Sequence, residues 1–196
     1  MVRFALVAAL LAAAAPAAAE APASQPGFRA AEWQIRQGQW HFTAAGELEC
    51  AGKGRSSLVY FTGAKPRDLD VEVDVMFLGP ESSAGIVFRA AGAPYGRETF
   101  YQFEWYTRGT HHDKRLSLMV KNPQWKQIVT PTYPEAPLRR WIALRVRVAG
   151  DVIECFVDGQ RVFQRRDRTY VRAGRVGLHV WQPRAVKFRN WRLTEP

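Results

Sequence analysis

A strict alternation of apolar and polar residues between residues 140 and 193 restricts the fold more than any other feature of this sequence. In the run 141–148 every second residue is a branched apolar one, and Ala143, Arg145 and Arg147 fill the positions between. Such a period of two is typical of a half-buried β-strand. Asp158-Gly159 then predicts a hairpin turn between strands at 152–157 and 161–166. Two further runs of the same kind, 174–180 and 185–193, follow near the end.

The rest of the chain repeats this pattern, and no helical period in it exceeds one turn. Its longest early run, 69–78, places Val71, Val73, Val75 and Phe77 on one face. About thirteen short strands separated by turn residues predict an all-β sandwich or barrel. Because each strand has one apolar face to bury, we expect two packed antiparallel sheets. The other residues expected to point into the core are Tyr101, Phe103, Trp105, Leu116, Leu118, Val120, Val176, Leu178 and Val180.

Four motifs in the last third carry a family resemblance. They are Trp-x-x-Leu-x-Val-x-Val at 141–148, Asp-x-Ile-x-x-Phe-Val-Asp-Gly-x-x-Val at 151–162, Gly-Arg-Val-Gly-Leu at 174–178 and Val-x-Phe-Arg-Asn-x-x-Leu at 186–193. In this order they resemble the C-terminal half of laminin G-like and concanavalin A-like jelly rolls, and most of all the bacterial 3-keto-disaccharide hydrolase family. The Trp-x-Ile opening at 33–35 is similar to the start of that family. The resemblance implies a two-sheet antiparallel jelly-roll sandwich.

The N-terminal residues 1–19 are predicted to be a secretory signal peptide. A basic start precedes an apolar run, and Ala17-Ala18-Ala19 offers a cleavage site before Glu20. The run is shorter than the roughly 20 residues of a membrane span. We therefore expect an exported protein, periplasmic or secreted, and not an integral membrane protein; a retained anchor is the alternative. Residues 20–31 are predicted to form a tether, and residues 32–196 the jelly-roll domain.

The net charge of +10 raises the question of an anionic partner. The arginines are scattered singly over the expected outer faces, without a run of five basic residues. This distribution argues against nucleic acid and is typical of a solvated surface, with an acidic polysaccharide or the cell envelope as the alternative. Cys50 and Cys155 permit a disulfide in an exported protein, while the apolar strand around Cys155 favours two separate buried thiols. The sequence leaves both open.

Asp70, Glu72 and Asp74 alternate on one strand and allow two interpretations. Laminarinase-type hydrolases of this fold class carry alternating acids on a strand, and same-face neighbours lie about 6.8 Å apart, close to the spacing of a retaining pair. The order Asp-x-Glu-x-Asp differs from the laminarinase signature. A charged outer face that discourages association is the more common use of such a strand.

No metal or cofactor is expected from the sequence. His111-His112-Asp113 could supply metal ligands, but no further ligand follows at a telling spacing, so a polar loop tip is favoured. Related sugar-binding jelly rolls often carry Phe-Asp in the last strand, where this chain has Phe188-Arg189. Without that carboxylate a calcium site is disfavoured.

Strand parity predicts a candidate site on the outer face of one sheet. If Tyr101, Phe103 and Trp105 face the core, the residues between them face outward, and the same count applies to 176–181. In a jelly roll the outer side of one sheet is concave, and planar side chains beside polar groups could hold a sugar there. The alternative places these residues on the convex sheet or in solvent. The candidates are Arg89, Gln102, Glu104, Tyr106, His179 and Trp181.

The family resemblance implies roles for these residues. In 3-keto-disaccharide hydrolases the matching strands resemble Asn-Ser-Gly-Ile-x-x-Arg, Tyr-Glu-x-Gln and Gly-Leu-Gln-x-His, so Arg89 and Tyr101 are kept. Gln102 stands at the Glu position, Glu104 at the Gln position and Trp181 at the His position. Because glutamine cannot transfer protons, the catalytic role passes to Glu104 with His179, and Arg89, Gln102, Tyr106 and Trp181 become substrate-binding residues.

Three functions therefore follow as expectations. The first is an exported jelly-roll domain that recognises a carbohydrate or cell-envelope glycan on its concave sheet. The second is a hydrolase or lyase acting on 3-keto-glycosides. The third is a non-catalytic periplasmic protein that binds a protein partner. The fold permits all three.

Overall fold

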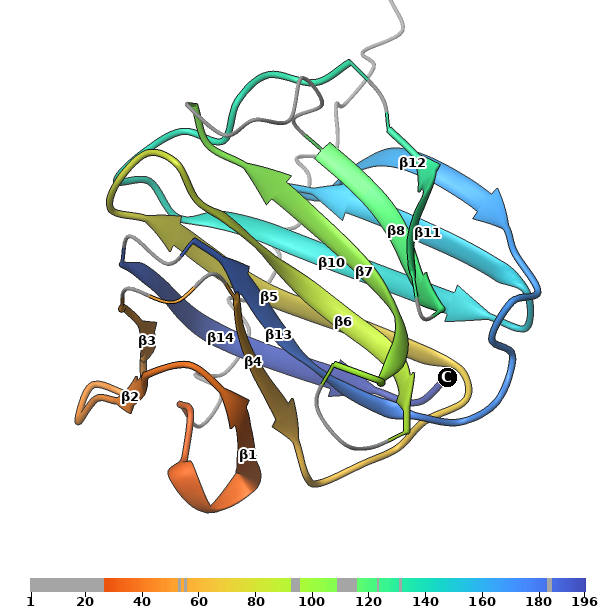
Figure 1. Ribbon diagram of the computed structural model, residues 1–196, viewed down its shortest axis with the longest axis horizontal. Coiled ribbons are helices and arrows are strands. Elements are labelled where there is room, and N and C mark those ends of the chain that lie inside the picture. The colour runs from red at the N-terminus through yellow and green to blue at the C-terminus, as the bar shows by residue number, and fades with distance from the viewer. Residues whose placement is uncertain are drawn as a thin grey trace, which may run out of the picture.

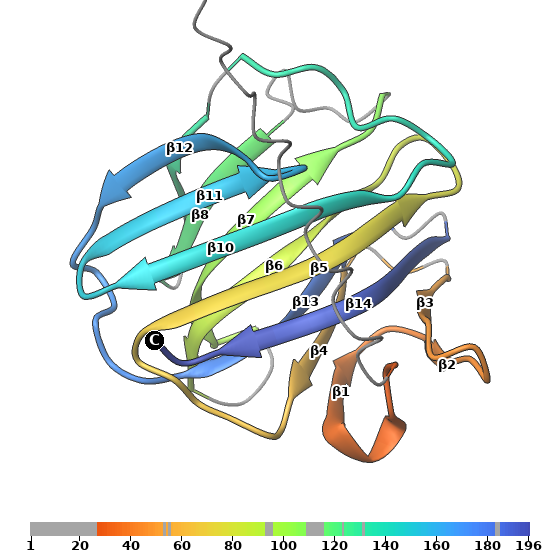
Figure 2. The same cartoon turned by 180° about the vertical axis from the view of Figure 1, so that it is seen from behind.

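The computed structural model describes residues 27–196 except 53, 55, 93–95, 109–115, 123, 131 and 183–184. Two seven-stranded antiparallel sheets pack face to face in a sandwich, seen from its two sides in Figures 1 and 2. A 3₁₀ turn, η1 (Ala30–Glu32), precedes the first strand. The predicted all-β jelly-roll sandwich is confirmed.

The sheet nearer the viewer in Figure 1 is called the front sheet. From edge to edge it contains β1 (Trp33–Gln37), β4 (Ser56–Phe61), β13 (Arg175–Trp181), β6 (Ser83–Ala91), β7 (Thr99–Tyr106), β8 (Leu116–Asn122) and β9 (Gln124–Val129). The back sheet faces the viewer in Figure 2. It contains β12 (Gln160–Arg166), β11 (Val152–Val157), β10 (Ile142–Ala149), β5 (Leu69–Phe77), β14 (Val186–Thr194), β3 (Leu48–Cys50) and β2 (Trp40–Phe42).

The core lies between the two sheets and follows the predicted alternation. In β5, Val71, Val73, Val75 and Phe77 are fully buried. The apolar positions of β10 stand opposite them, with Leu144 paired to Val73. The remaining residues predicted to point inward, on β7, β8 and β13, belong to the same core cluster. Burial of these faces removes apolar surface from water, which is the main force that joins the sheets.

The outer face of the back sheet carries the three alternating acids, and each one contacts an arginine. Arg145 donates to both carboxylate oxygens of Asp70, at 2.7 and 2.5 Å. Glu72 lies 3.9 Å from Arg192, and Asp74 accepts from Arg189 at 3.1 Å. These ion pairs form the charged outer face of the back sheet. The pocket described below lies on the other side of the sandwich, on the outer face of the front sheet.

Both cysteines are free and buried. Cys50 lies on β3 and Cys155 on β11, and β10, β5 and β14 separate these strands in the back sheet. The structure therefore has two separate buried thiols in place of a disulfide. Burial raises the pKa of Cys50 to about 11 and raises that of Cys155 as well.

The beginning of the described chain is more closely packed than a tether. Phe28, which the sequence assigns to the tether, is buried in the core, with its ring 5.0 Å from that of Trp33. The predicted signal peptide and the His111-His112-Asp113 segment lie outside the described residues. Within the part of the chain that the structure describes, no helix is long and apolar enough to span a membrane.

Candidate functional site

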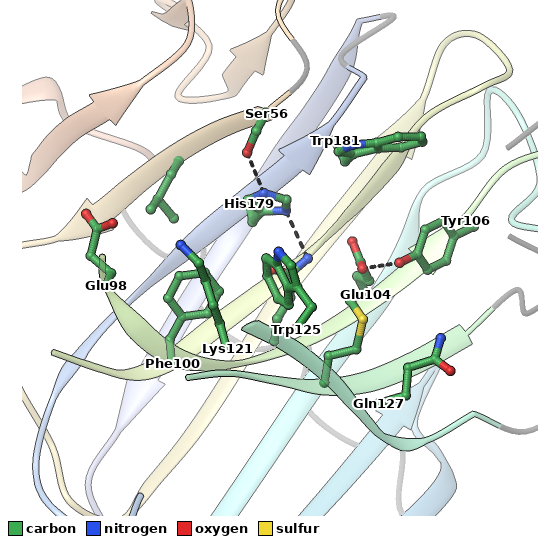
Figure 3. A pocket seen from close by; sticks show the side chains of 13 residues that line it. Ser56, Glu98, Phe100, Glu104, Tyr106, Lys121, Trp125, Gln127, His179 and Trp181 are labelled. Carbon is green, nitrogen blue, oxygen red and sulfur yellow. Dashed lines mark hydrogen bonds between the residues drawn. The ribbon is translucent and has the colours of Figure 1, made fainter. Parts of the chain in front are cut away.

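A pocket of about 430 Å³ opens on the outer face of the front sheet (Figure 3). Small-molecule sites in proteins commonly occupy about 300–1,000 Å³. Side chains from β4, β7, β8, β9 and β13 line it, together with Glu98 from the segment before β7. Of the residues predicted for the site, it brings together Gln102, Glu104, Tyr106, His179 and Trp181.

Strand parity explains why these side chains face the pocket. In β7, Tyr101 and Phe103 point into the core, so the alternate residues Gln102 and Glu104 point to the outer side. In β13, Leu178 and Val180 are core residues, which turns His179 outward in the same way. The core prediction and the site prediction therefore depend on one alternation.

A glycine in β6 allows side chains of its two neighbouring strands, β7 and β13, to approach each other across it. Gly85 of β6 pairs with both Glu104 of β7 and His179 of β13. A Cβ at this position would overlap the carbonyl oxygen of Phe103 and lie 2.6 Å from Glu104 Cα. Because β6 presents only backbone here, the side chains of its neighbours meet above it.

A chain of hydrogen bonds runs along the pocket floor from β4 to β7. Nε2 of His179 lies 2.8 Å from Ser56 Oγ, and Nδ1 lies 2.9 Å from Gln102 Nε2 (Figure 3). An amide nitrogen only donates, so Nδ1 accepts and the ring proton is on Nε2, which donates to Ser56. Burial, with a smaller contribution from the charge of Lys121, lowers the pKa of His179 to about 3. The ring is therefore neutral, with both nitrogens engaged.

Glu104 is the most heavily hydrogen-bonded acid of the pocket. It accepts from Ser83 Oγ at 2.8 Å and from the Tyr106 hydroxyl. Its burial raises its pKa, and Tyr106, Ser83 and the nearby Gln102 amide oppose that shift in part. A carboxyl that keeps its proton to higher pH can act as a general acid toward a leaving oxygen. His179, neutral and bonded at both nitrogens, is better placed to hold Gln102 than to transfer a proton.

The walls of the pocket are largely aromatic. Trp125 of β9 is 47% exposed and packs edge-on against Phe100, with ring centroids 5.4 Å apart. Its ring centroid lies 6.3 Å from that of His179. Trp181 of β13 provides a second indole. Figure 3 shows Glu98 toward one end of the pocket and Tyr106 toward the other.

The pocket is also lined by residues that the sequence did not predict for the site, among them Trp125, Phe100, Glu98 and Lys121. Lys121 has the outward parity of its strand, which is a usable signal. Trp125 lies on the edge strand β9, and only the curvature of the sheet brings it near His179 of β13. Strand parity carries no information about curvature. Glu98 directly precedes β7. Its carboxylate accepts from the Gly96 amide at 2.8 Å and lies 3.5 Å from Arg36.

Arg89 does not join the pocket, contrary to the sequence-based assignment. Its backbone has φ +51°, and the register of β6 shifts between Phe88 and Ala91, so the strand loses its alternation there. The buried guanidinium instead donates to the carbonyl oxygens of Arg67 at 2.9 Å, Tyr170 at 2.9 Å and Gly150 at 2.6 Å, and to Asp68 at 3.2 Å. Arg89 therefore joins loops at one end of the sandwich.

Tyr101, the other residue kept from the family pattern, is also a core residue. Its ring stacks on Phe88 at 5.3 Å, and its hydroxyl donates to Asp167 at 2.5 Å.

Among the described residues, no group of three or more histidines, cysteines or acids could hold a metal ion.

Comparison with known proteins identifies relatives of this fold. A family model for the 3-keto-alpha-glucoside-1,2-lyase-like domain matches residues 25–194. No curated protein sequence matches the chain.

Several solved structures share the architecture. The carbohydrate-binding module CBM66 from Bacillus subtilis has a TM-score of 0.70 at 18% identity, covering 84% of this chain and 96% of its own. A Bacillus subtilis protein of unknown function with a galectin-like fold has a TM-score of 0.70 at 11% identity, covering 89% and 95%. The potassium-bound carbohydrate recognition domain of Emp46p has a TM-score of 0.64 at 8% identity, covering 84% and 89%. At these identities the likeness shows the fold alone.

Proposed function

Because the chain belongs to the 3-keto-alpha-glucoside-1,2-lyase-like family, we propose that it binds a glycan or glycoside in the pocket of its front sheet. The observation that carries this proposal is the combination of aromatic walls with a polar floor. Trp125 and Trp181 offer planar surfaces, and Gln102 and Glu104 offer hydrogen-bonding atoms. Indole rings stack on the faces of sugar rings while buried polar groups bind hydroxyls, which is how a mostly apolar pocket selects a polar ligand.

Structural neighbours add support of a general kind. One is described as a carbohydrate-binding module and another as a carbohydrate recognition domain. Their sequences are too distant to transfer a ligand or a set of contact residues. The choice of sugar therefore depends on this chain's own pocket.

A glycan array followed by calorimetric titration tests the proposal. We expect Trp181→Ala to weaken binding of the sugar found on the array by about tenfold or more, which corresponds to about 1.4 kcal/mol. Trp141→Ala is the matched control, because its indole lies under Arg189 at the back sheet, 4.2 Å from the guanidinium carbon. Equal weakening by both changes, or by neither, contradicts a front-sheet site.

A second candidate function is cleavage of 3-keto-glycosides, with Glu104 as general acid. The family membership and the raised pKa of Glu104 favour it. In this reaction Glu104 donates its proton to the glycosidic oxygen as the bond from that oxygen to the anomeric carbon breaks, and a water molecule adds its hydroxyl to that carbon and returns a proton to Glu104. Incubation with 3-keto-trehalose should release product, and Glu104→Gln should abolish the release. Glu72→Gln, the same change on the back sheet, should leave it intact. Absence of both binding and turnover would favour a protein partner, to be sought by pull-down.

Export is proposed as well, from the apolar run and the Ala-x-Ala site at 17–19. Mass spectrometry of the mature N-terminus tests it. We expect a first residue at or near Glu20 and recovery in the periplasmic or extracellular fraction. An intact Met1 on the accumulated protein would contradict export by signal-peptide cleavage.

A further inference from the structure

We infer that the floor of the pocket is built as a fixed hydrogen-bond acceptor, so that it selects an uncharged sugar that donates a hydroxyl to Gln102 Oε1 over a sugar acid. The inference rests on the proposed carbohydrate function and deepens it by naming the class of sugar. Ser56 and His179 serve in it as positioning residues for Gln102.

The starting observation is an unpaired acceptor at a buried position. The side chain of Gln102 is fully buried, and it lines the pocket. Its nitrogen donates to Nδ1 of His179, but among the described residues its oxygen Oε1 has no hydrogen-bond partner. A buried amide oxygen without a partner destabilises the folded protein, because it has given up its hydrogen bonds to water. A ligand hydroxyl can satisfy this atom.

The neighbours of Gln102 determine which way its amide points. Glu104 is an acceptor, so a reversed amide would place Oε1 against a carboxylate. Ser83 and Tyr106 already donate to that carboxylate and hold it in place. With the amide nitrogen donating to His179, Nδ1 of His179 must accept, and the Nε2 proton goes to Ser56. Each hydrogen bond in the series from Ser56 through His179 to Gln102 then has one donor and one acceptor.

The charges around the pocket disfavour an anionic ligand. Among the lining residues that the structure describes, Glu98 and Glu104 are buried acids and none is an arginine. Lys121 is the one lysine of this described set, and its Nζ already donates to the Gly96 carbonyl oxygen at 3.0 Å. A sugar carboxylate in this pocket would lose its hydration without gaining the paired donors that a guanidinium provides. A hydroxyl brings a proton to Oε1 and no charge.

Nitrogen-resolved NMR of the intact protein tests the geometry without a ligand. We expect the ring of His179 to be neutral and protonated on Nε2 between about pH 5 and pH 8. Ser56→Ala should move the Nε2 signal while the protein remains folded. A ring protonated on Nδ1 would mean that Oε1 is already occupied as an acceptor, and it would overturn the inference.

The same signals report on ligand class when methyl β-glucopyranoside and methyl β-glucuronide are titrated at equal concentrations. We expect the glucoside to shift the His179 signals at an at least tenfold lower concentration, and Gln102→Met to remove that preference. A glucuronide that binds equally well or better would keep the proposed function and overturn this inference. If neither sugar shifts the signals while the Nε2 tautomer is present, the carbohydrate proposal falls together with the class of sugar.

Discussion

Two buried polar side chains of the front sheet, His179 and Arg89, illustrate what a single residue's surroundings decide. His179 follows the regular alternation of β13 and faces the pocket, where burial keeps it neutral. Arg89 comes after a break in the alternation of β6, and it satisfies backbone carbonyls at the end of the sandwich. Both strands alternate regularly up to the break in β6. Strand parity therefore predicts the placement of His179 correctly and that of Arg89 wrongly.

His179 should make the stability of the protein depend on pH. The folded pKa of about 3 lies below the ordinary value of 6.5, so below that value the unfolded chain binds a proton that the folded chain does not. Stability is therefore full above pH 6.5 and is lost as the pH falls toward 3. Compared with His179→Gln, the wild type should lose about 2 kcal/mol more of unfolding free energy between pH 6.5 and pH 5. Parallel urea-denaturation profiles for the two proteins would contradict a buried neutral histidine.

Arg89 should be important for stability and not for ligand contact. Removing its guanidinium leaves the carbonyl oxygens of Gly150 and Tyr170 without this donor, and it leaves Asp68 with the Gly150 amide but without its ion-pair partner. We expect Arg89→Ala to lower the free energy of unfolding by about 3–5 kcal/mol. The matched control is Arg165→Ala, at an exposed position of β12, which should change stability by less than about 0.5 kcal/mol. Similar losses for the two variants in denaturant titrations would refute the structural role.

At the scale of the elements, alternation locates the strands well but does not reveal how they are paired. The strand predicted at 152–157 has the observed bounds, and the predicted runs 69–78, 141–148, 161–166, 174–180 and 185–193 agree with β5, β10, β12, β13 and β14 within one residue at each end. The position of β13 between β4 and β6 joins segments far apart in the chain. No local sequence pattern reveals that these strands are neighbours, or that the sheet curves so that β9 approaches His179. Gln102, Glu104 and His179 were therefore predictable from the sequence, while Ser56 and the wall contributed by Trp125 were not.

Gly85 provides the element-scale prediction, because β6 lacks a side chain between Glu104 and His179, next to the point where His179 contacts Gln102. Gly85→Ala should lower stability by about 1–3 kcal/mol and shift the His179 ring signals, since the new methyl group forces β6 and β7 apart. Gly54→Ala is the control, because among the described residues the atom nearest to a Cβ there is Ser56 O, at 3.8 Å. Unchanged His179 signals in a folded Gly85→Ala protein would show that the two side chains do not meet above this glycine.

The whole molecule combines a basic composition with a pocket lined by acids. The net charge of +10 is spread over exposed arginines, several of which pair with the acids of the back sheet. Composition alone suggests an anionic partner, and only the three-dimensional arrangement separates the basic surface from the pocket. The core is large enough for the domain to need no covalent staple.

The absence of a Cys50–Cys155 bridge predicts how the folded protein responds to reductant. Both thiols are buried on separate strands, so reduction has no bond to break. The thermal unfolding midpoint should be the same with and without excess dithiothreitol, and both thiols should react with a labelling reagent only after unfolding. A midpoint that falls by several degrees on reduction would contradict the placement of β3 and β11.

The central claim is that a sugar binds on the outer face of the front sheet, above Gln102 and beside the indoles of Trp125 and Trp181. The most direct measurement is a crystal structure of the protein with the sugar selected by the glycan array. The account predicts a sugar ring against at least one of these indoles, with a hydroxyl within hydrogen-bond distance of Gln102 Oε1. A sugar bound at the back sheet or at the loops around Arg89, with this pocket unchanged, would contradict it.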